Sequence, residues 1–262
     1  MSPAVAIYEG RRILATAAGP AVAACPGCAS PMRAKRGTVV VHHWAHLPDP
    51  DRQCVSEGET EWHLGWKNRA GDPDRIEVAV GNRRADVLTP YGWAIEFQHS
   101  PLSPPDIAAR ERDWRDRMLW VYDGLEAFAE ERLEINQPPG RAYWSFKWRW
   151  HKRHVAASKV PTFIQVKPDT LLFVGRWYPK SPGDPLRGYG WRLTDDDFEQ
   201  HVMNGSKPPV PPKFGRDLAP AMWSRTPSIP FTCPCCDQPF AEPGKCSAAL
   251  WHVNGPNYQA AS

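Results

Sequence analysis

The chain has 262 residues, seven cysteines and a formal net charge of +3 at pH 7. Its length allows one core domain of ordinary size with one or two small appendages. The odd number of cysteines argues against a complete disulfide framework and favours metal sites in a reducing, cytoplasmic compartment. The sequence contains no run of eighteen apolar residues, so we expect no membrane-spanning helix. The net charge is too small to indicate a polyanionic partner, and no feature indicates the oligomeric state.

The N-terminal residues predict a hairpin followed by a metal-binding lobe. Residues 5–14 have the pattern of a β-hairpin that turns at Glu9-Gly10. The segment from Cys25 to Cys28 is a Cys-Pro-Gly-Cys knuckle, whose two thiolates can share one ion. A histidine follows after seventeen residues, and a further cysteine follows that histidine at a spacing of eight. The predicted ligands of this structural Cys₃His zinc site are Cys25, Cys28, His46 and Cys54.

Two neighbouring histidines compete for the third zinc position. His43 precedes His46 by three residues, and His42 is a further possibility. The alternative to a metal site is a set of free buried thiols. A pair of cysteines separated by Pro-Gly has little reason to lie in a core, which favours zinc.

The next segment has the pattern of a helix with one functional face. Glu59, His63 and Lys67 follow one another at steps of four, so in a helix starting at Glu59 they line one face. A face of this kind is commonly only a solvated surface. The residues that follow this segment therefore decide whether its polar face is functional or only solvated.

Two strands, near residues 83–89 and 93–98, then form a predicted hairpin. Asp86 alternates with apolar neighbours in the first strand, and Glu96 and Gln98 do so in the second. Two carboxylates that converge from paired strands repel each other unless a cation lies between them. A hard divalent cation with oxygen ligands satisfies this arrangement. The alternative is an ordinary amphipathic hairpin with a solvated polar face.

The chain continues with a predicted helix over 104–118, which carries Arg110, and an apolar strand over 119–122. A helix between two strands predicts a crossover that places the second strand parallel to the strand of Glu96. Further strands are predicted near residues 143–150, 161–166 and 170–175. The order of these elements predicts an α/β core.

This ordered set of motifs resembles the competence protein CoiA-like nucleases of the PD-(D/E)XK superfamily. The motifs are Glu-Thr-x-x-His with a later Lys, Arg-Ala-Asp-Val, Ile-Glu-Phe-Gln-x-Ser, and the helix and strand after them. The similarity also includes the Cys-Pro-Gly-Cys and His-Trp-Ala-His segments, and it extends from about residue 20 to about residue 125, more loosely to about 205. One position departs from the superfamily motif, because Gln98 stands where a lysine is usual.

The resemblance implies a restriction-endonuclease-like core and a metal-dependent mechanism. Asp86 and Glu96, with the carbonyl of Phe97, would bind one or two Mg²⁺ or Mn²⁺ ions, and Glu59 would complete the shell. Gln98 would orient the attacking water by hydrogen bonding but cannot deprotonate it, because an amide does not titrate. Positive charge near the scissile phosphate would then come from another residue. The accessory active-site residues are His63, Lys67 and Arg110.

A basic and aromatic segment follows the predicted core strands. Residues 141–153 contain five Lys or Arg and no acid. If residues 145–150 form a strand, Phe146, Trp148 and Trp150 point to one side and the cations to the other. The basic side would then contact phosphates, or it would be an edge strand with solvated cations. The candidate DNA contacts are Lys147, Arg149, Lys152 and Arg153.

Residues 207–213 are a proline-rich spacer before a C-terminal cysteine cluster. A second zinc site is possible there, with an exposed redox-sensitive thiol group that includes Cys235 as the alternative. The expected domains are residues 1–56, a zinc-ribbon-like lobe, residues 57–206, the nuclease-like core, and residues 207–262, the spacer and a Cys-rich lobe. The possible ligands of the second site are Cys233, Cys236, Cys246 and His252.

These observations predict a metal-dependent DNA nuclease that cuts phosphodiester bonds in transformation, recombination or a mobile-element setting. The main alternative is a zinc-ribbon module that binds DNA on an inactive nuclease fold. A zinc- or redox-sensing regulator is a third possibility. The sequence does not select single-stranded, duplex or branched DNA, because phosphate contacts carry no information about shape or sequence.

Overall fold

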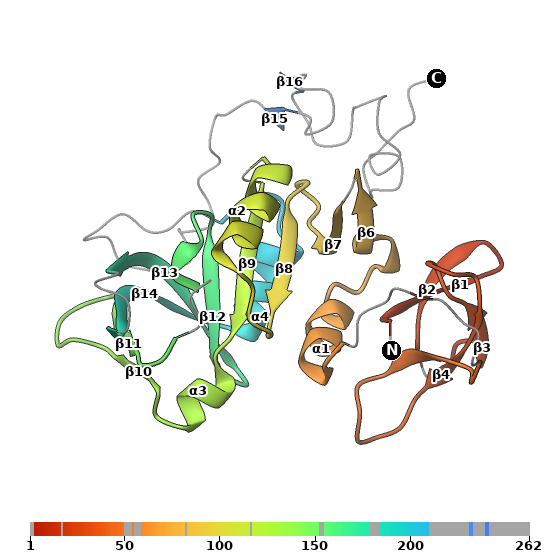
Figure 1. Ribbon diagram of the computed structural model, residues 1–262, viewed down its shortest axis with the longest axis horizontal. Coiled ribbons are helices and arrows are strands. Elements are labelled where there is room, and N and C mark those ends of the chain that lie inside the picture. Colours follow the sequence, from red (N-terminus) through yellow and green to blue (C-terminus); the bar gives the residue numbers. More distant parts are fainter. Residues whose placement is uncertain are drawn as a thin grey trace. The chain divides into compact units, whose positions relative to one another are not determined.

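The computed structural model is of α/β class and divides into two compact units, residues 1–88 and 89–262 (Figure 1). The first unit contains the predicted zinc lobe together with the first helix and hairpin of the predicted core; the division into three domains stays a prediction. No helix in the described part of the chain has the length and apolar character needed to cross a membrane. The structure describes residues 3–16, 18–49, 54, 59–81, 83–115, 117–151, 155–178 and 184–209, and the backbone of 231–232 and 239–240.

An antiparallel sheet in the first unit has the strand order β2-β1-β3-β4-β5. The predicted hairpin is confirmed, since β1 and β2 are joined by Glu9 and Gly10, with φ of 49° and 75°. A two-residue turn with positive φ at both positions matches the twist of its strands, and glycine adopts that conformation without steric cost. The strands are β1 (Val5–Tyr8), β2 (Arg11–Leu14), β3 (Val22–Ala24), β4 (Pro31–Lys35) and β5 (His43–His46).

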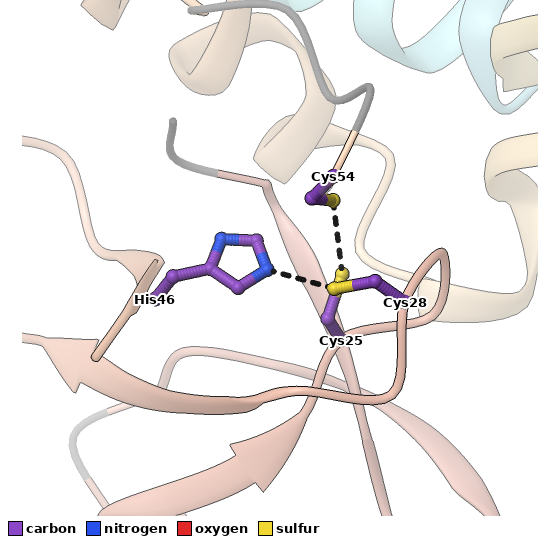
Figure 2. A group of neighbouring side chains, drawn as sticks. All are labelled: Cys25, Cys28, His46 and Cys54. Carbon is purple, nitrogen blue, oxygen red and sulfur yellow. Dashed lines mark hydrogen bonds between the residues drawn. The ribbon is translucent and has the colours of Figure 1, made fainter. Parts of the chain in front are cut away.

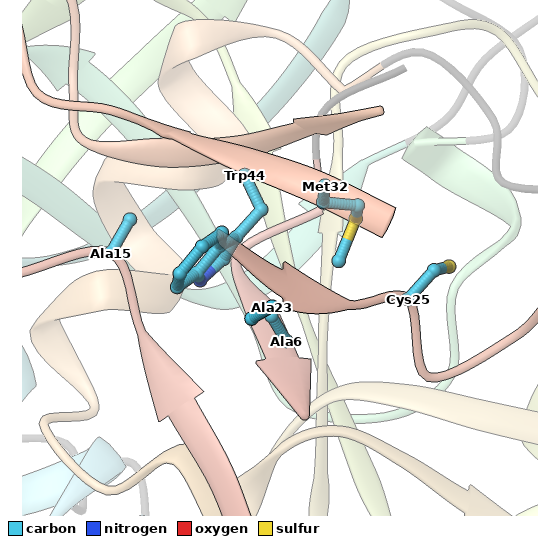
Figure 3. Packing of buried hydrophobic residues seen from close by; sticks show 6 residues of the cluster. All are labelled: Ala6, Ala15, Ala23, Cys25, Met32 and Trp44. Carbon is cyan, nitrogen blue, oxygen red and sulfur yellow. The ribbon is translucent and has the colours of Figure 1, made fainter. Parts of the chain in front are cut away.

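The core of this sheet is small. Figure 3 shows the ring of Trp44 among small side chains, which leave room for the indole. Cys25, a predicted zinc ligand, belongs to the same core. A core of this size buries little apolar surface, and such small folds commonly need a metal or a cross-link for stability. The buried members are Ala6, Ala15, Ala23, Cys25, Met32 and Trp44.

The first unit continues with helix α1 (Glu61–Arg69), whose start differs from the prediction. Thr60 is the N-cap, and its hydroxyl accepts a hydrogen bond from the His63 amide at 3.4 Å. A capping threonine lies directly before the first helical residue, so the helix begins at Glu61, two residues after Glu59. Glu59 therefore precedes the helix, and the prediction that it shares a helical face with His63 and Lys67 is wrong.

A short 3₁₀ turn, η1 (Pro73–Arg75), leads from α1 into the hairpin of β6 (Ile76–Val80) and β7 (Arg83–Leu88). The strand predicted near 83–89 is confirmed by β7. Ala85 and Val87 are fully buried and the intervening Asp86 is not, as the alternation predicted. Glu77 has a backbone φ of 53°, which is unusual for a residue other than glycine.

The second unit is built on a large mixed sheet in the order β8-β9-β12-β13-β14-β11-β10 (Figure 1). β8 pairs with β9 in parallel, as predicted, and Glu96 lies opposite Trp120. β9 pairs with β12 in parallel, and the remaining neighbours are antiparallel. The strands are β8 (Ala94–Gln98), β9 (Met118–Asp123), β10 (Leu133–Asn136), β11 (Trp144–Trp148), β12 (Thr162–Lys167), β13 (Thr170–Tyr178) and β14 (Leu186–Thr194).

The crossover between β8 and β9 is helix α2 (Pro104–Asp113). Ser103 caps its start by accepting a hydrogen bond from the Asp106 amide at 3.2 Å. The helix was predicted to reach Met118, but it ends earlier. Arg115 has a φ of 50°, a left-handed conformation that interrupts the helix, and Met118 begins β9.

β9 and β12 form the centre of the second unit. Residues 118–121 of β9 are fully buried, and so are Phe163 and Ile164 of β12. Continuous burial is typical of parallel strands covered on both faces. The remaining elements are α3 (Leu125–Ala129), η2 (Val155–Ala157), α4 (Asp195–Phe198), η3 (Glu199–Met203), β15 (Phe231–Thr232) and β16 (Pro239–Phe240).

The predicted aromatic strand is shorter than expected. Phe146 and Trp148 of β11 are buried, as predicted. Trp150 is 76% exposed and has a φ of 50°, because β11 ends at Trp148 and a turn follows. The prediction that Trp150 shares the buried face is therefore wrong.

Candidate functional site

The predicted zinc ligands lie together in the first unit. Cys25 and Cys28 come from the turn between β3 and β4, and His46 is the last residue of β5. Figure 2 shows these three side chains and Cys54 pointing toward one another. Their ligand atoms all lie within 4.8 Å of one another. Three thiols and an imidazole form a group that could bind zinc.

The distances fit one tetrahedral ion. Zinc bonds of about 2.3 Å to sulfur and about 2.0 Å to nitrogen imply edges of about 3.8 Å between two sulfurs and about 3.5 Å between sulfur and nitrogen. The Sγ atoms of Cys25 and Cys54 are 3.9 Å apart. Cys28 Sγ lies 3.4 Å from His46 Nε2. Both separations agree with a shared ion.

Local backbone contacts form the knuckle. The Gly27 amide donates to Cys25 Sγ at 3.4 Å, and the Ala29 amide donates to the Cys25 carbonyl at 2.9 Å. Burial raises the pKa of the Cys25 thiol to about 11, although the amides of Cys28 and Gly27 act in the opposite direction. A buried thiol of this kind is converted to a thiolate when a metal binds.

The competing histidines have other contacts. His43 Nδ1 lies 2.8 Å from the Val41 carbonyl, and the His42 carbonyl accepts from the Asn68 side chain at 3.0 Å. The group of ligand atoms includes His46 and neither of these two. The described residues therefore favour His46 as the third ligand.

A second cluster in the first unit surrounds Lys67. This side chain is 2% exposed, and its Nζ lies 2.5 Å from Glu59, 3.0 Å from Asp86 and 3.4 Å from Glu77. Two of these acids, Glu59 and Asp86, were predicted active-site residues, and Lys67 was a predicted accessory residue. The structure brings these three together although Glu59 precedes the helix.

The charges in this cluster are strongly coupled. Burial raises the pKa of Glu59 to about 7 against the opposing effect of Lys67, and Glu77 and Asp86 raise it further. Burial by itself would lower the pKa of Lys67, but Asp86, Glu77 and Glu59 together raise it above its ordinary value. One buried ammonium thus balances carboxylates from three parts of the chain. Arg84, with a half-exposed side chain, adds a contact of 4.0 Å to Glu77.

The sequence analysis missed Glu77. It lies in β6 between apolar neighbours and is 7% exposed. Its Oε1 also accepts from the Ala4 amide at 3.2 Å, which ties the first strand region to the cluster. The available signal was an acid inside the apolar run Ile76-Glu77-Val78, where an unpaired charge would be costly.

His63 makes contacts of a different kind. Its Nδ1 lies 2.8 Å from the Thr60 hydroxyl, and its ring packs edge-on against Trp62 at 5.1 Å between centroids. These contacts belong to the start of α1. The role of His63 as an accessory active-site residue stays a prediction.

The second unit holds a buried acid with its own cation. Glu96 is 4% exposed in the middle of β8, and Arg110 of α2 donates to its Oε2 at 2.6 Å. Glu96 therefore does not belong to a solvated strand face. Arg110 was predicted to supply positive charge near the scissile phosphate, and here it forms an ion pair with the buried acid. Gln98 donates through Nε2 to the Ser100 carbonyl.

The predicted catalytic centre combines residues of both units. Asp86 belongs to the first unit, whereas Glu96 and Gln98 belong to the second. Their convergence on one Mg²⁺ or Mn²⁺ ion stays a prediction. Within the described residues, three or more Cys, His, Asp or Glu side chains lie close enough together to hold one ion in the Cys₃His group.

The predicted DNA contacts are partly described. Lys147 and Arg149 both reach Glu134 of β10, at 3.6 and 3.2 Å. Arg149 also donates to the Glu131 carbonyl at 2.5 Å. The other candidates, Lys152 and Arg153, lie outside the described residues, as do Cys233, Cys235, Cys236, Cys246 and His252.

Comparison with models of protein families, with curated proteins and with solved structures gave no match. The two groups of side chains in the first unit, the Cys₃His group and the Lys67 cluster, are thus described from this chain alone. The ion pair between buried Glu96 and partly exposed Arg110 is the corresponding feature of the second unit.

Proposed function

We propose that this chain is a metal-dependent nuclease that hydrolyses phosphodiester bonds in DNA. The observation that carries the proposal is the burial of Lys67 among three carboxylates. Burying charged groups is costly, and clusters with shifted pKa values are concentrated at functional sites. The ordered motifs that resemble CoiA-like nucleases support the same function.

The acids in the proposed site suit a hard cation. Asp86 and Glu96, with the Phe97 carbonyl, supply oxygen ligands of the kind that Mg²⁺ and Mn²⁺ take, and Glu59 adds a further carboxylate. When bound, the metal would lower the pKa of a water and neutralise charge that develops on the phosphate. Lys67 holds Glu59 and Asp86 in place through its contacts.

Two other residues complete the proposed mechanism. Gln98 would orient the attacking water through its amide, which can donate and accept but not titrate. Arg110 neutralises Glu96 in the described state and would share that carboxylate with the metal. We propose that zinc at the Cys₃His site is structural, because four protein ligands leave no position for a water.

Cleavage of labelled single-stranded, duplex and branched DNA with Mg²⁺ or Mn²⁺ tests the function. We expect Asp86→Asn and Glu96→Gln each to reduce the rate by at least about a hundredfold, since each removes a metal-binding charge. Glu126→Gln, a change at an exposed acid of α3, is the matched control and should cut at the wild-type rate. A wild-type rate in Asp86→Asn would contradict the proposal.

A non-cleaving DNA-binding module is the second candidate. Gln98 favours it, because a lysine is usual at this position of the nuclease motif and the Gln98 amide instead donates to the Ser100 carbonyl. In that case the wild-type protein binds DNA and cuts none of the substrates with either metal. The same cleavage experiment therefore separates the two candidates.

A further inference from the structure

One face of the sheet in the second unit carries alternating aromatic and basic side chains on β11, β14 and β13. Tyr189 of β14 pairs with Ser145 on one side and with Arg176 on the other. Residues that pair directly across strands project to the same face of a sheet. Lys147 and Tyr178 both pair with Arg187, which lies two residues from Tyr189 in β14, so these side chains project to the same side. This surface, here called the tyrosine face, contains Ser145, Lys147, Arg176, Tyr178, Arg187 and Tyr189.

The tyrosines of this face form a continuous patch. The Tyr189 ring lies 5.4 Å from that of Tyr143 and 6.2 Å from that of Tyr178, between centroids. The Arg176 guanidinium lies over the Tyr178 ring at 5.4 Å. Tyr178 is 44% exposed, and Arg176 and Arg187 are exposed. The patch thus combines accessible ring surface with accessible cations.

The opposite face of the same strands is the packed one. Phe146 and Trp148 are buried there, and a Cβ on Gly188 would come within 2.5 Å of the Phe146 ring. The core therefore has its own aromatic residues. The exposed position of Tyr178 is not explained by a need to fill the core.

Gly175 has no side chain, so two aromatic rings of β14 can lie close to the backbone of β13. A Cβ on Gly175 of β13 would approach the Trp191 ring to 2.5 Å and the Tyr189 ring to 2.9 Å. Both rings therefore lie close over the bare backbone of this strand. The rings of Tyr178 and Tyr189 are tilted by 43° to each other, so each ring offers its own surface for stacking with a planar group.

The charge of the face indicates which planar group fits. Lys147, Arg149, Arg176 and Arg187 lie in or beside its rows, and the acid paired with two of them is Glu134. Glu134 therefore neutralises only part of the positive charge of these four side chains. An aromatic surface interleaved with excess cations matches a strand of nucleic acid, whose bases stack on rings while its phosphates contact Arg and Lys.

We infer that the tyrosine face binds single-stranded DNA, with bases stacked on Tyr178 and Tyr189 and phosphates held by Arg176 and Arg187. A duplex hides the faces of its bases, whereas a single strand offers them to aromatic side chains. This inference rests on the proposed function in that it names the form of DNA that the nuclease takes. It also places Lys147, a predicted DNA contact, in one row with Arg187 and Tyr178 of the neighbouring strands.

Fluorescence anisotropy without added divalent cation tests the inference, because binding is then measured without cleavage. The probes are a labelled oligothymidine of about 20 nucleotides, a duplex of equal length and an RNA of matching sequence. We expect the single-stranded DNA to bind at least about tenfold more tightly than the duplex. Tyr178→Ala and Arg187→Ala should each weaken that binding about tenfold.

Controls separate stacking from unspecific effects. Tyr8→Ala changes an exposed tyrosine of the first unit and should bind like the wild type. Arg187→Ala should also reduce the slope of log affinity against log salt by about 0.7, the value for one phosphate contact on a single strand. Tyr178→Phe should bind like the wild type, since the ring is retained.

Equal affinity for duplex and single strand, wild-type binding by Tyr178→Ala and Arg187→Ala, or tighter binding of RNA would each overturn the inference. The proposed function can then still stand, if Asp86→Asn loses cleavage of duplex DNA. The converse result is that the protein binds single-stranded DNA through Tyr178 and cuts no DNA with Mg²⁺ or Mn²⁺. That result supports the inference and contradicts the proposed nuclease function.

Discussion

At the scale of single residues, Lys67 has the least ordinary environment in the described chain. It is almost fully buried, yet it keeps its charge because Glu59, Glu77 and Asp86 surround its ammonium group. Such an arrangement depends on every member, because each charge is stabilised mainly by the others. Substitutions in the cluster should therefore have large effects on stability as well as on activity.

Replacement of Lys67 by methionine tests this dependence. The substitution keeps much of the volume but leaves three carboxylates without their common cation, so we expect the free energy of unfolding to fall by about 3–5 kcal/mol. Urea denaturation followed by circular dichroism measures the change. Lys167→Met, at an exposed lysine, is the control and should change stability by less than about 0.5 kcal/mol. A similar small change in Lys67→Met would show that the cluster does not hold the first unit together.

The protonation of Glu59 predicts a dependence of stability on pH. Burial raises the pKa of this carboxyl from 4.5 to about 7 in the folded protein. Between these values the folded chain keeps a proton that the unfolded chain has lost. The free energy of unfolding should therefore decrease as the pH rises from about 4.5 to about 7, and this contribution is constant above that range.

Glu59→Gln removes this contribution. In buffer free of divalent cations, the stability of the variant relative to the wild type should increase between about pH 5 and about pH 7. Urea midpoints at several pH values, with Glu134→Gln as the control at a half-exposed acid, measure the difference. Identical pH profiles for Glu59→Gln and the wild type would mean that Glu59 is ionised throughout this range.

At the scale of elements, the sheet of β1 to β5 carries a Cys₃His group that could bind zinc. The sheet has a core of few residues, and its ligands come from the β3–β4 turn, the end of β5 and Cys54. A bound zinc ion would connect these three segments. Its binding free energy would add to the stability of the sheet, because the unfolded chain lacks a preformed site.

The two histidines near the end of the sheet allow a matched test of this site. His46→Ala should lose one zinc ion per chain and lower the stability of the sheet, whereas His43→Ala should keep the zinc content of the wild type. Native mass spectrometry counts the ions, and thermal unfolding measures the stability. Loss of an ion in His43→Ala with retention in His46→Ala would reverse the ligand assignment.

At the scale of the whole molecule, contacts within the first unit join the sheet of β1 to β5 to the Lys67 cluster. The Ala4 amide donates to Glu77, Asn68 of α1 donates to the His42 carbonyl, and Arg12 of β2 donates to the Pro73 carbonyl at 3.1 Å. These contacts connect both ends of the sheet with the helix and hairpin that carry the acids. The sheet of β1 to β5 therefore supports the segment in which Glu59, Lys67 and Asp86 meet.

The second unit combines a buried parallel part with an antiparallel part that carries exposed side chains. β8, β9 and β12 are largely buried, and Glu96 of β8 pairs with Arg110 of α2. β13, β14 and β11 carry the tyrosine face. The proposed chemistry and the proposed recognition of single strands thus belong to different parts of one sheet.

The sequence by itself determined the features that depend on local spacing. The turn at Glu9 and Gly10, the parallel pair of β8 and β9 and the Cys-Pro-Gly-Cys knuckle follow from turn chemistry, strand alternation and ligand spacing. These signals act over a few residues or over one crossover connection. They are therefore readable before any tertiary contact is known.

The tertiary structure alone decided which distant side chains share an environment. Glu77 joins Glu59 at Lys67, and Tyr189 joins Arg176 on one face, through strand pairing that no local pattern encodes. Burial and pairing depend on the whole chain, so the charge states and surfaces that they create appear only after folding.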